Sequence, residues 1–130
     1  MDIELPLDFK EFLKLLNENS VRYLLIGEYA VGYHGCPRAT NDMDVWVAVH
    51  PELTPELFLQ EKKIVRMGHP PMRLEISTGI SGVEFEECYA THIVDDLDGV
   101  EVHIIDLPHL KANKKAAGRL KDLADLENLP

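Results

Sequence analysis

Two short apolar runs constrain the fold of this chain more than any other feature of its sequence. Residues 22–26 are too few for a stable helix and are followed by Gly27, and residues 44–49 are nearly all apolar and are followed by Pro51. A short apolar run bounded by glycine or proline predicts a buried strand. Strands that lack an apolar–polar alternation have both faces covered. The chain therefore requires a sheet with helices packed against it.

Helical patterns surround these strands. Apolar side chains at helical spacing predict a helix over residues 8–17. In chain order, the other expected elements are a helix over 28–33, a short helix over 55–60, strands over 64–67 and 72–77, a short helix over 83–88, strands over 92–95 and 100–105 joined by a turn at Asp98-Gly99, and helices from residue 108 to the end with a break at Gly118. We therefore expect an α/β (α+β) fold, a mixed sheet flanked by helices, in a single domain over residues 1–130.

The charge of the chain limits the kinds of ligand it binds. Its 23 acidic and 13 basic side chains give a formal net charge of −10. Such a surface repels nucleic acids and membranes unless its cations are concentrated in one place. Five cations do gather in one C-terminal stretch: Lys111, Lys114, Lys115, Arg119 and Lys121. We expect a small anionic ligand in a local basic pocket, and no long nucleic acid.

The sequence also indicates a compartment. No apolar run approaches the roughly 20 residues that a membrane span needs. The N-terminus is acidic and lacks the basic start and apolar stretch of a secretory signal. Cys36 and Cys88 lie far apart and match no metal-ligand spacing, which favours two reduced thiols. We therefore expect a cytoplasmic protein that does not contact membranes.

Two aspartates begin the second apolar strand. Asp42 and Asp44 are two residues apart, so their side chains point to the same face of the sheet. Two carboxylates held so close repel each other unless a cation lies between them, and oxygen ligands of this kind suit Mg²⁺ or Mn²⁺. Upstream, Gly27 ends the first strand and a helix follows at once, an arrangement that lets backbone N–H groups approach a phosphate closely.

This ordered combination resembles the DNA-polymerase-beta-like nucleotidyltransferase superfamily, in its minimal single-domain branch. The signature of that superfamily is a strand, Gly-Gly or Gly-Ser, a helix, and Asp-x-Asp at the start of the next strand. Residues 38–44, Arg-Ala-Thr-Asn-Asp-Met-Asp, are similar to a variant found in uncharacterised bacterial and abortive-infection-type members. Residues 113–126 are similar to the C-terminal helix of the same group. The resemblance covers nearly the whole chain.

The resemblance implies metal-assisted transfer of a nucleoside monophosphate from a nucleoside triphosphate to a hydroxyl of a small molecule or a protein. Asp42 and Asp44 would bind Mg²⁺ (or Mn²⁺) in a two-metal arrangement. Glu75, where relatives usually carry aspartate, would be the third carboxylate, which completes the metal site and helps to deprotonate the hydroxyl. These three residues are therefore the expected catalytic and metal-binding groups.

The resemblance also implies a nucleotide site. Gly27 and the helix that follows would cradle the triphosphate, and Arg38, Lys114 or Arg119 would offset charge on the departing pyrophosphate. Glu28 occupies the position of the motif's second glycine or serine, which places a carboxylate beside the expected triphosphate.

Two further functions stay open beside the enzyme. Because of Glu28, the chain could be a catalytically degenerate relative that serves as a binding or regulatory partner, such as an antitoxin-like component of a toxin–antitoxin pair. It could also be a plain α/β interaction domain with its carboxylates on the surface. Only residues 50–63 separate two expected strands, where relatives usually place a full helix. A small domain with an open cleft often pairs, so both a homodimer and a complex with a partner protein are compatible with the sequence.

Overall fold

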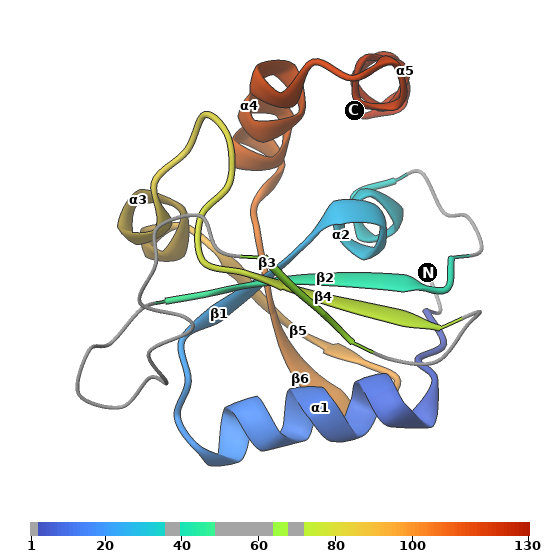
Figure 1. Ribbon diagram of the computed structural model, residues 1–130, viewed down its shortest axis with the longest axis vertical. Coiled ribbons are helices and arrows are strands. Elements are labelled where there is room, and N and C mark those ends of the chain that lie inside the picture. Colours follow the sequence, from blue (N-terminus) through green and yellow to red (C-terminus); the bar gives the residue numbers. More distant parts are fainter. Residues whose placement is uncertain (1–2, 36–39, 49–63, 68–71) are drawn as a thin grey trace.

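A six-stranded mixed sheet organises the computed structural model, which describes residues 3–35, 40–48, 64–67 and 72–130 (Figure 1). The strands are β1 (Tyr23–Ile26), β2 (Asp42–Val47), β3 (Ile64–Met67), β4 (Arg73–Ser77), β5 (Ile93–Leu97) and β6 (Val100–Ile104). Their order across the sheet is β3-β4-β2-β1-β6-β5. β1 is antiparallel to β2 and parallel to β6, while β2 is parallel to β4. The expected mixed sheet is therefore confirmed.

Helices cover both faces of this sheet. They are α1 (Leu7–Glu18), α2 (Gly27–Tyr33), α3 (Phe85–Ala90), α4 (Leu107–Ala117) and α5 (Leu120–Asn128). Figure 1 shows α1 on one side of the sheet and α2, α4 and α5 on the other. Phe9 and Leu13 of α1 are buried, as their helical spacing predicts. The helix-flanked α/β architecture is thus the one that the sequence indicates.

The core lies on the two strands predicted from the apolar runs. All four residues of β1 are buried, and β1 sits inside the sheet between β2 and β6. On β2, Met43, Val45 and Trp46 are buried. Because β1 and most of β2 are buried, the strand that carries Asp42 and Asp44 has a fixed position in the sheet.

The predicted elements agree closely with the observed ones; the largest shifts are in β2, α3 and β5, and β5 runs from Ile93 to Leu97 instead of over 92–95. β2 begins at Asp42 and not at residue 44, because Asp42 already pairs with Arg73 of β4. The short helix predicted over 83–88 runs from Phe85 to Ala90, because the backbone at Glu84, the N-cap residue, is still extended. The break predicted at Gly118 separates α4 from α5. The helix predicted over 55–60, together with Cys36 and Arg38, lies outside the described residues.

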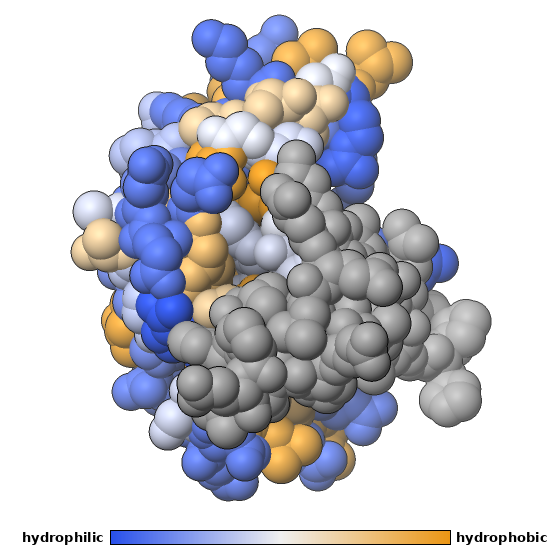
Figure 2. Space-filling view, turned by 60° about the vertical axis from the view of Figure 1, so that its left-hand side comes forward, coloured by the Kyte–Doolittle hydropathy of each residue, from blue (hydrophilic) through white to orange (hydrophobic). Residues whose placement is uncertain are grey.

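The described part of the surface carries few large apolar side chains. Figure 2 shows mostly hydrophilic side chains on one face, with hydrophobic ones in small groups among them. The exposed large hydrophobic residues of the described ranges are Leu7, Leu15, Val94, Leu120 and Leu123. None of the described helices has the length and apolar character needed to cross a bilayer.

Candidate active site

Three carboxylates lie on the neighbouring strands β2 and β4. Asp42 and Asp44 occupy alternate positions of β2, and Glu75 lies directly across from Asp44 in the parallel ladder. Asp42 is exposed, whereas Asp44 and Glu75 are half-buried. Burial, a hydrogen bond with the Glu75 carboxyl, and the nearby charges of Glu75 and Asp42 raise the pKa of Asp44 to about 7. The site therefore favours a proton or a cation at Asp44.

Gly27, which follows the end of β1, lies against the Asp44 side chain. Its φ of +67° lies in the left-handed region, and a Cβ at this position would overlap the Asp44 carboxylate. A residue with a side chain would have to be strained and would also displace Asp44. The glycine predicted from the motif is thus required by the contact between α2 and β2.

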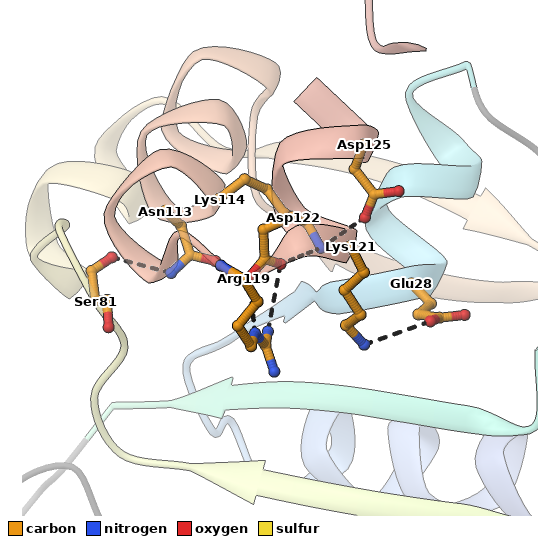
Figure 3. Close-up of polar contacts among 8 residues, drawn as sticks. All are labelled: Glu28, Ser81, Asn113, Lys114, Arg119, Lys121, Asp122 and Asp125. Carbon is orange, nitrogen blue, oxygen red and sulfur yellow. Dashed lines mark hydrogen bonds and ion pairs between the residues drawn. The ribbon is translucent and has the colours of Figure 1, made fainter. Parts of the chain in front are cut away.

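Helices α4 and α5 form the opposite wall. Lys114 of α4 is buried, and its Nζ lies 3.2 Å from Asp122 Oδ1 and 3.0 Å from Asp125 Oδ2 on α5 (Figure 3). Arg119 Nε donates to Asp122 Oδ2 at 2.7 Å. Burial alone would raise the pKa of Asp122, but hydrogen bonds from Arg119 and Lys114 outweigh it and lower that pKa. Lys114 therefore ties the two helices together through charges that are paired inside the protein.

Arg119 and Lys121 present their charges at the protein surface. The Arg119 side chain is 66% exposed, and its hydrogen bond with Asp122 is the largest of the causes that raise its pKa. The charges of Asp44 and Glu75 raise the same pKa, so the guanidinium lies within electrostatic reach of the carboxylates. Lys121 Nζ lies 3.7 Å from Glu28 Oε1, which joins the start of α5 to the first turn of α2 (Figure 3).

A cavity of about 620 Å³ lies between these walls. Seven of the eight site residues expected from the sequence line it: Gly27, Glu28, Asp42, Asp44, Glu75, Lys114 and Arg119. The eighth, Arg38, lies outside the described residues. The cavity is large enough for a ligand of nucleotide size. Its lining carries three acids on β2 and β4 and three cations on and between α4 and α5, together with Arg73 on β4 and Glu28 on α2.

Comparison with known proteins identifies the fold. No family model matches the chain, and no curated protein matches its sequence. An antigenic nucleotidyltransferase-like protein from Paracoccidioides brasiliensis has a similar crystal structure, with a TM-score of 0.56 over 92% of this chain and 72% of that one, at 17% sequence identity. The chain has a nucleotidyltransferase-like fold. At this identity the likeness concerns the fold, and the bacterial abortive-infection branch stays a prediction.

The carboxylates of this nucleotidyltransferase-like fold suit a hard cation by their chemistry. Asp42 and Asp44 of β2 and Glu75 of β4 supply carboxylate oxygens on neighbouring strands, and the raised pKa of Asp44 marks a place where positive charge is favourable. Within the described ranges, no three acidic, histidine or cysteine side chains are arranged to hold a metal ion. Asp44 and Glu75 instead share a hydrogen bond, so cation binding would require them to lose that proton.

The structure adds site residues that the sequence interpretation did not single out. Asp122 and Asp125 are buried on α5 as partners of Lys114. Asn113 Nδ2 donates to the Ser81 carbonyl at 2.9 Å and so holds the loop after β4 against α4 (Figure 3). The available signal was the pair of acids three residues apart in α5, a spacing that places both on one helix face.

Proposed function

We propose that this chain is a nucleotidyltransferase, which transfers a nucleoside monophosphate from a nucleoside triphosphate to a hydroxyl of a small molecule or a protein and requires Mg²⁺ or Mn²⁺. The observation that carries the proposal is the cavity whose sheet side holds Asp42, Asp44 and Glu75 and whose helix side holds Arg119. Phosphoryl transfer is mainly positioning and electrostatic stabilisation, and this cavity offers both kinds of charge.

In the proposed reaction, Asp42, Asp44 and Glu75 would hold the cation, which when bound would neutralise charge on the phosphate oxygens. The hydroxyl oxygen of the acceptor forms a bond to the α-phosphorus while the bond from that phosphorus to the pyrophosphate oxygen breaks. The hydroxyl proton passes to the Glu75 carboxylate and then to water. The products are the nucleoside monophosphate ester of the acceptor and pyrophosphate.

The wall of the cavity formed by α4 and α5 would stabilise the departing pyrophosphate. Arg119 and Lys121 carry exposed cationic groups on the cavity lining, and both are suited to phosphate oxygens. Lys114 contributes differently, because its ammonium is already bound by Asp122 and Asp125. Its proposed role is to position α5, and with it the two exposed cations.

Calorimetric titration of the four ribonucleoside triphosphates, each with and without Mg²⁺, tests the proposal. We expect Mg²⁺-dependent binding by the wild type and its loss in Asp44→Asn. Asp8→Asn, on the exposed face of α1, is the matched control and should bind like the wild type. Wild-type affinity in Asp44→Asn would show that these carboxylates do not bind the metal and nucleotide.

A degenerate, antitoxin-like partner protein is the second candidate. The observation that favours it is Glu28, whose carboxylate lines the cavity and pairs with Lys121. A triphosphate would meet this negative charge and would compete with Glu28 for Lys121. If no nucleotide binds to the wild type but one binds to Glu28→Gly, the degenerate function becomes the better account.

A further inference from the structure

Two histidines that the proposed function does not use contact each other beside α3. His92 follows α3 in the chain, and His103 lies on β6. His92 Nε2 and His103 Nδ1 are 2.8 Å apart, which is a hydrogen-bonding distance. Both rings are half-buried, and the Tyr89 ring of α3 is stacked on them, with its centroid 4.1 Å from that of His92 and 6.2 Å from that of His103. The hydrogen bond therefore joins the end of α3 to β6 in a partly desolvated place.

The partners of the four ring nitrogens determine where the protons lie. His92 Nδ1 faces the Tyr89 carbonyl oxygen, which can only accept, so this nitrogen carries a hydrogen. In neutral His92, Nε2 then has a lone pair, and His103 Nδ1 donates to it. The fourth nitrogen, His103 Nε2, lies 3.4 Å from Glu101 Oε2. Because a carboxylate also only accepts, one proton added to His103 Nε2 completes the network with His103 as the charged ring.

A second proton has a different effect. The one nitrogen left for it is His92 Nε2, which accepts from His103. Both facing nitrogens would then carry hydrogens on charged rings, and the hydrogen bond would become a close repulsion. Burial and the charge of His92 lower the pKa of His103, although its hydrogen bond with Glu101 acts in the opposite direction. The doubly charged pair therefore forms only in mild acid, with loss of the contact.

The surroundings of the pair offer little compensation for that second charge. The titratable or charged groups near it are Tyr89 on α3, Tyr23 on β1, Arg22 with its partner Glu86, Glu101 on β6, and Asp106 and His109, which Thr91 contacts. Within the described ranges, Glu101 is the one of these side chains that contacts a ring nitrogen of the pair. Val94, which lies opposite His103 on β5, carries no charge.

We propose that the hydrogen bond between His92 and His103 is a pH-sensitive contact, which holds the end of α3 against β6 at neutral pH and opens when both rings are protonated. The proposal goes beyond the nucleotidyltransferase function and does not depend on it. α3 has six residues, of which Cys88 is buried, so contacts of its other side chains hold it in place. The loop before α3 lines the large cavity through Gly79 and Ile80, so opening the pair loosens a segment that borders the candidate active site.

Nuclear magnetic resonance of the ring nitrogens tests the proton positions directly. We would record histidine ¹⁵N–¹H correlations of the wild type from pH 8 to pH 4.5. We expect a hydrogen on His92 Nδ1 at pH 8, and titration of the pair in two steps more than about one pH unit apart, because two groups in such close contact do not titrate independently. A hydrogen on His92 Nε2 at pH 8, or one shared midpoint for the two rings, would overturn the proposal.

Trp46, the one tryptophan of the chain, reports the position of α3. Its ring packs edge-on against Phe85, with centroids 5.2 Å apart, and Phe85 is stacked on Tyr89 at 5.3 Å. Tyr89 is in turn stacked on His92. Movement of the end of α3 away from β6 would therefore disturb this row of rings, and tryptophan emission should change between pH 7.5 and pH 5.

His103→Gln isolates the contribution of the pair, because the glutamine amide can donate to His92 but cannot take up a charge. Asp44 titrates in the same range and lies two residues from Trp46, so the signal of the pair is the part of the emission change that this variant removes. His109→Gln, at another half-buried histidine, is the matched control and should keep the wild-type change. The same change in His103→Gln as in the wild type would overturn the proposal.

Glu101→Gln provides a second variant in case His103→Gln does not fold. The Glu101 side chain is 65% exposed, so its replacement leaves the packing intact. Loss of its charge should lower the midpoint of the first histidine step by about half a pH unit, because that step places a proton beside this carboxylate. An unchanged midpoint would overturn the proposed network.

Discussion

Ionisation of the Asp44 carboxyl destabilises the folded state. Its pKa rises from 3.8 to about 7 because it is buried beside Glu75 and Asp42. A raised pKa in the folded state means that the protonated form is favoured, so this contribution to stability is complete below pH 4 and is lost as the pH rises through 7. We predict that Asp44→Asn raises the free energy of unfolding at pH 8 by about 2 kcal/mol and changes it little at pH 4. Urea denaturation at both values measures this, and a less stable variant at pH 8 would contradict it.

Lys114 is predicted to matter for stability, since its ammonium is bound by two buried carboxylates, Asp122 and Asp125. Lys114→Met would remove the cation that these two buried acids share, and breaking a buried ion pair typically costs about 3 kcal/mol. Lys115→Met, one residue away and exposed, should change the free energy of unfolding by less than about 0.5 kcal/mol. Equal stability of the two variants in chemical denaturation would show that the buried ion pairs do not hold α4 to α5.

At the scale of elements, the loop between β4 and α3 packs against α4. Alanine substitutions at two glycines measure how much that contact contributes to stability. Gly82 and Gly99 have φ angles of +80° and +83°, so alanine is strained at either position. A Cβ at Gly82 would overlap Ala116 of α4, whereas at Gly99 nothing lies within 4 Å. We expect Gly99→Ala to cost about 1 kcal/mol and Gly82→Ala about 3 kcal/mol in thermal or chemical unfolding. Equal losses of unfolding free energy in the two variants would show that the loop shifts to make room for the added methyl group beside α4.

The elements were predictable because each depends on local sequence, whereas the contacts between them were not. Alternation along β2 placed Asp42 and Asp44 on one face, but the register that sets Glu75 beside Asp44 depends on pairing between distant strands. Likewise, the sequence alone located the cations of the basic C-terminal stretch. That Lys114 is buried and neutralised while Arg119 is exposed follows from the packing of α5 across the break at Gly118. Helical periodicity within one element carries no information on that packing.

At the scale of the whole molecule, the net charge of −10 and the cations at one wall of the cavity together determine which anions can approach. Under the proposed function, a small triphosphate would occupy only the space between Arg119, Lys121 and the sheet, but a polynucleotide would extend beyond it over an acidic surface. Nucleic-acid affinity depends on many cation–phosphate contacts, each releasing counterions, and the described part of the chain concentrates its cations at one wall of the cavity. We predict no saturable binding of labelled single-stranded RNA in an anisotropy titration at low salt, where such attraction is strongest. Saturable binding that weakens as salt is added would reveal a cationic track that the described residues do not form, and would shift the expected acceptor from a small alcohol to a nucleic acid.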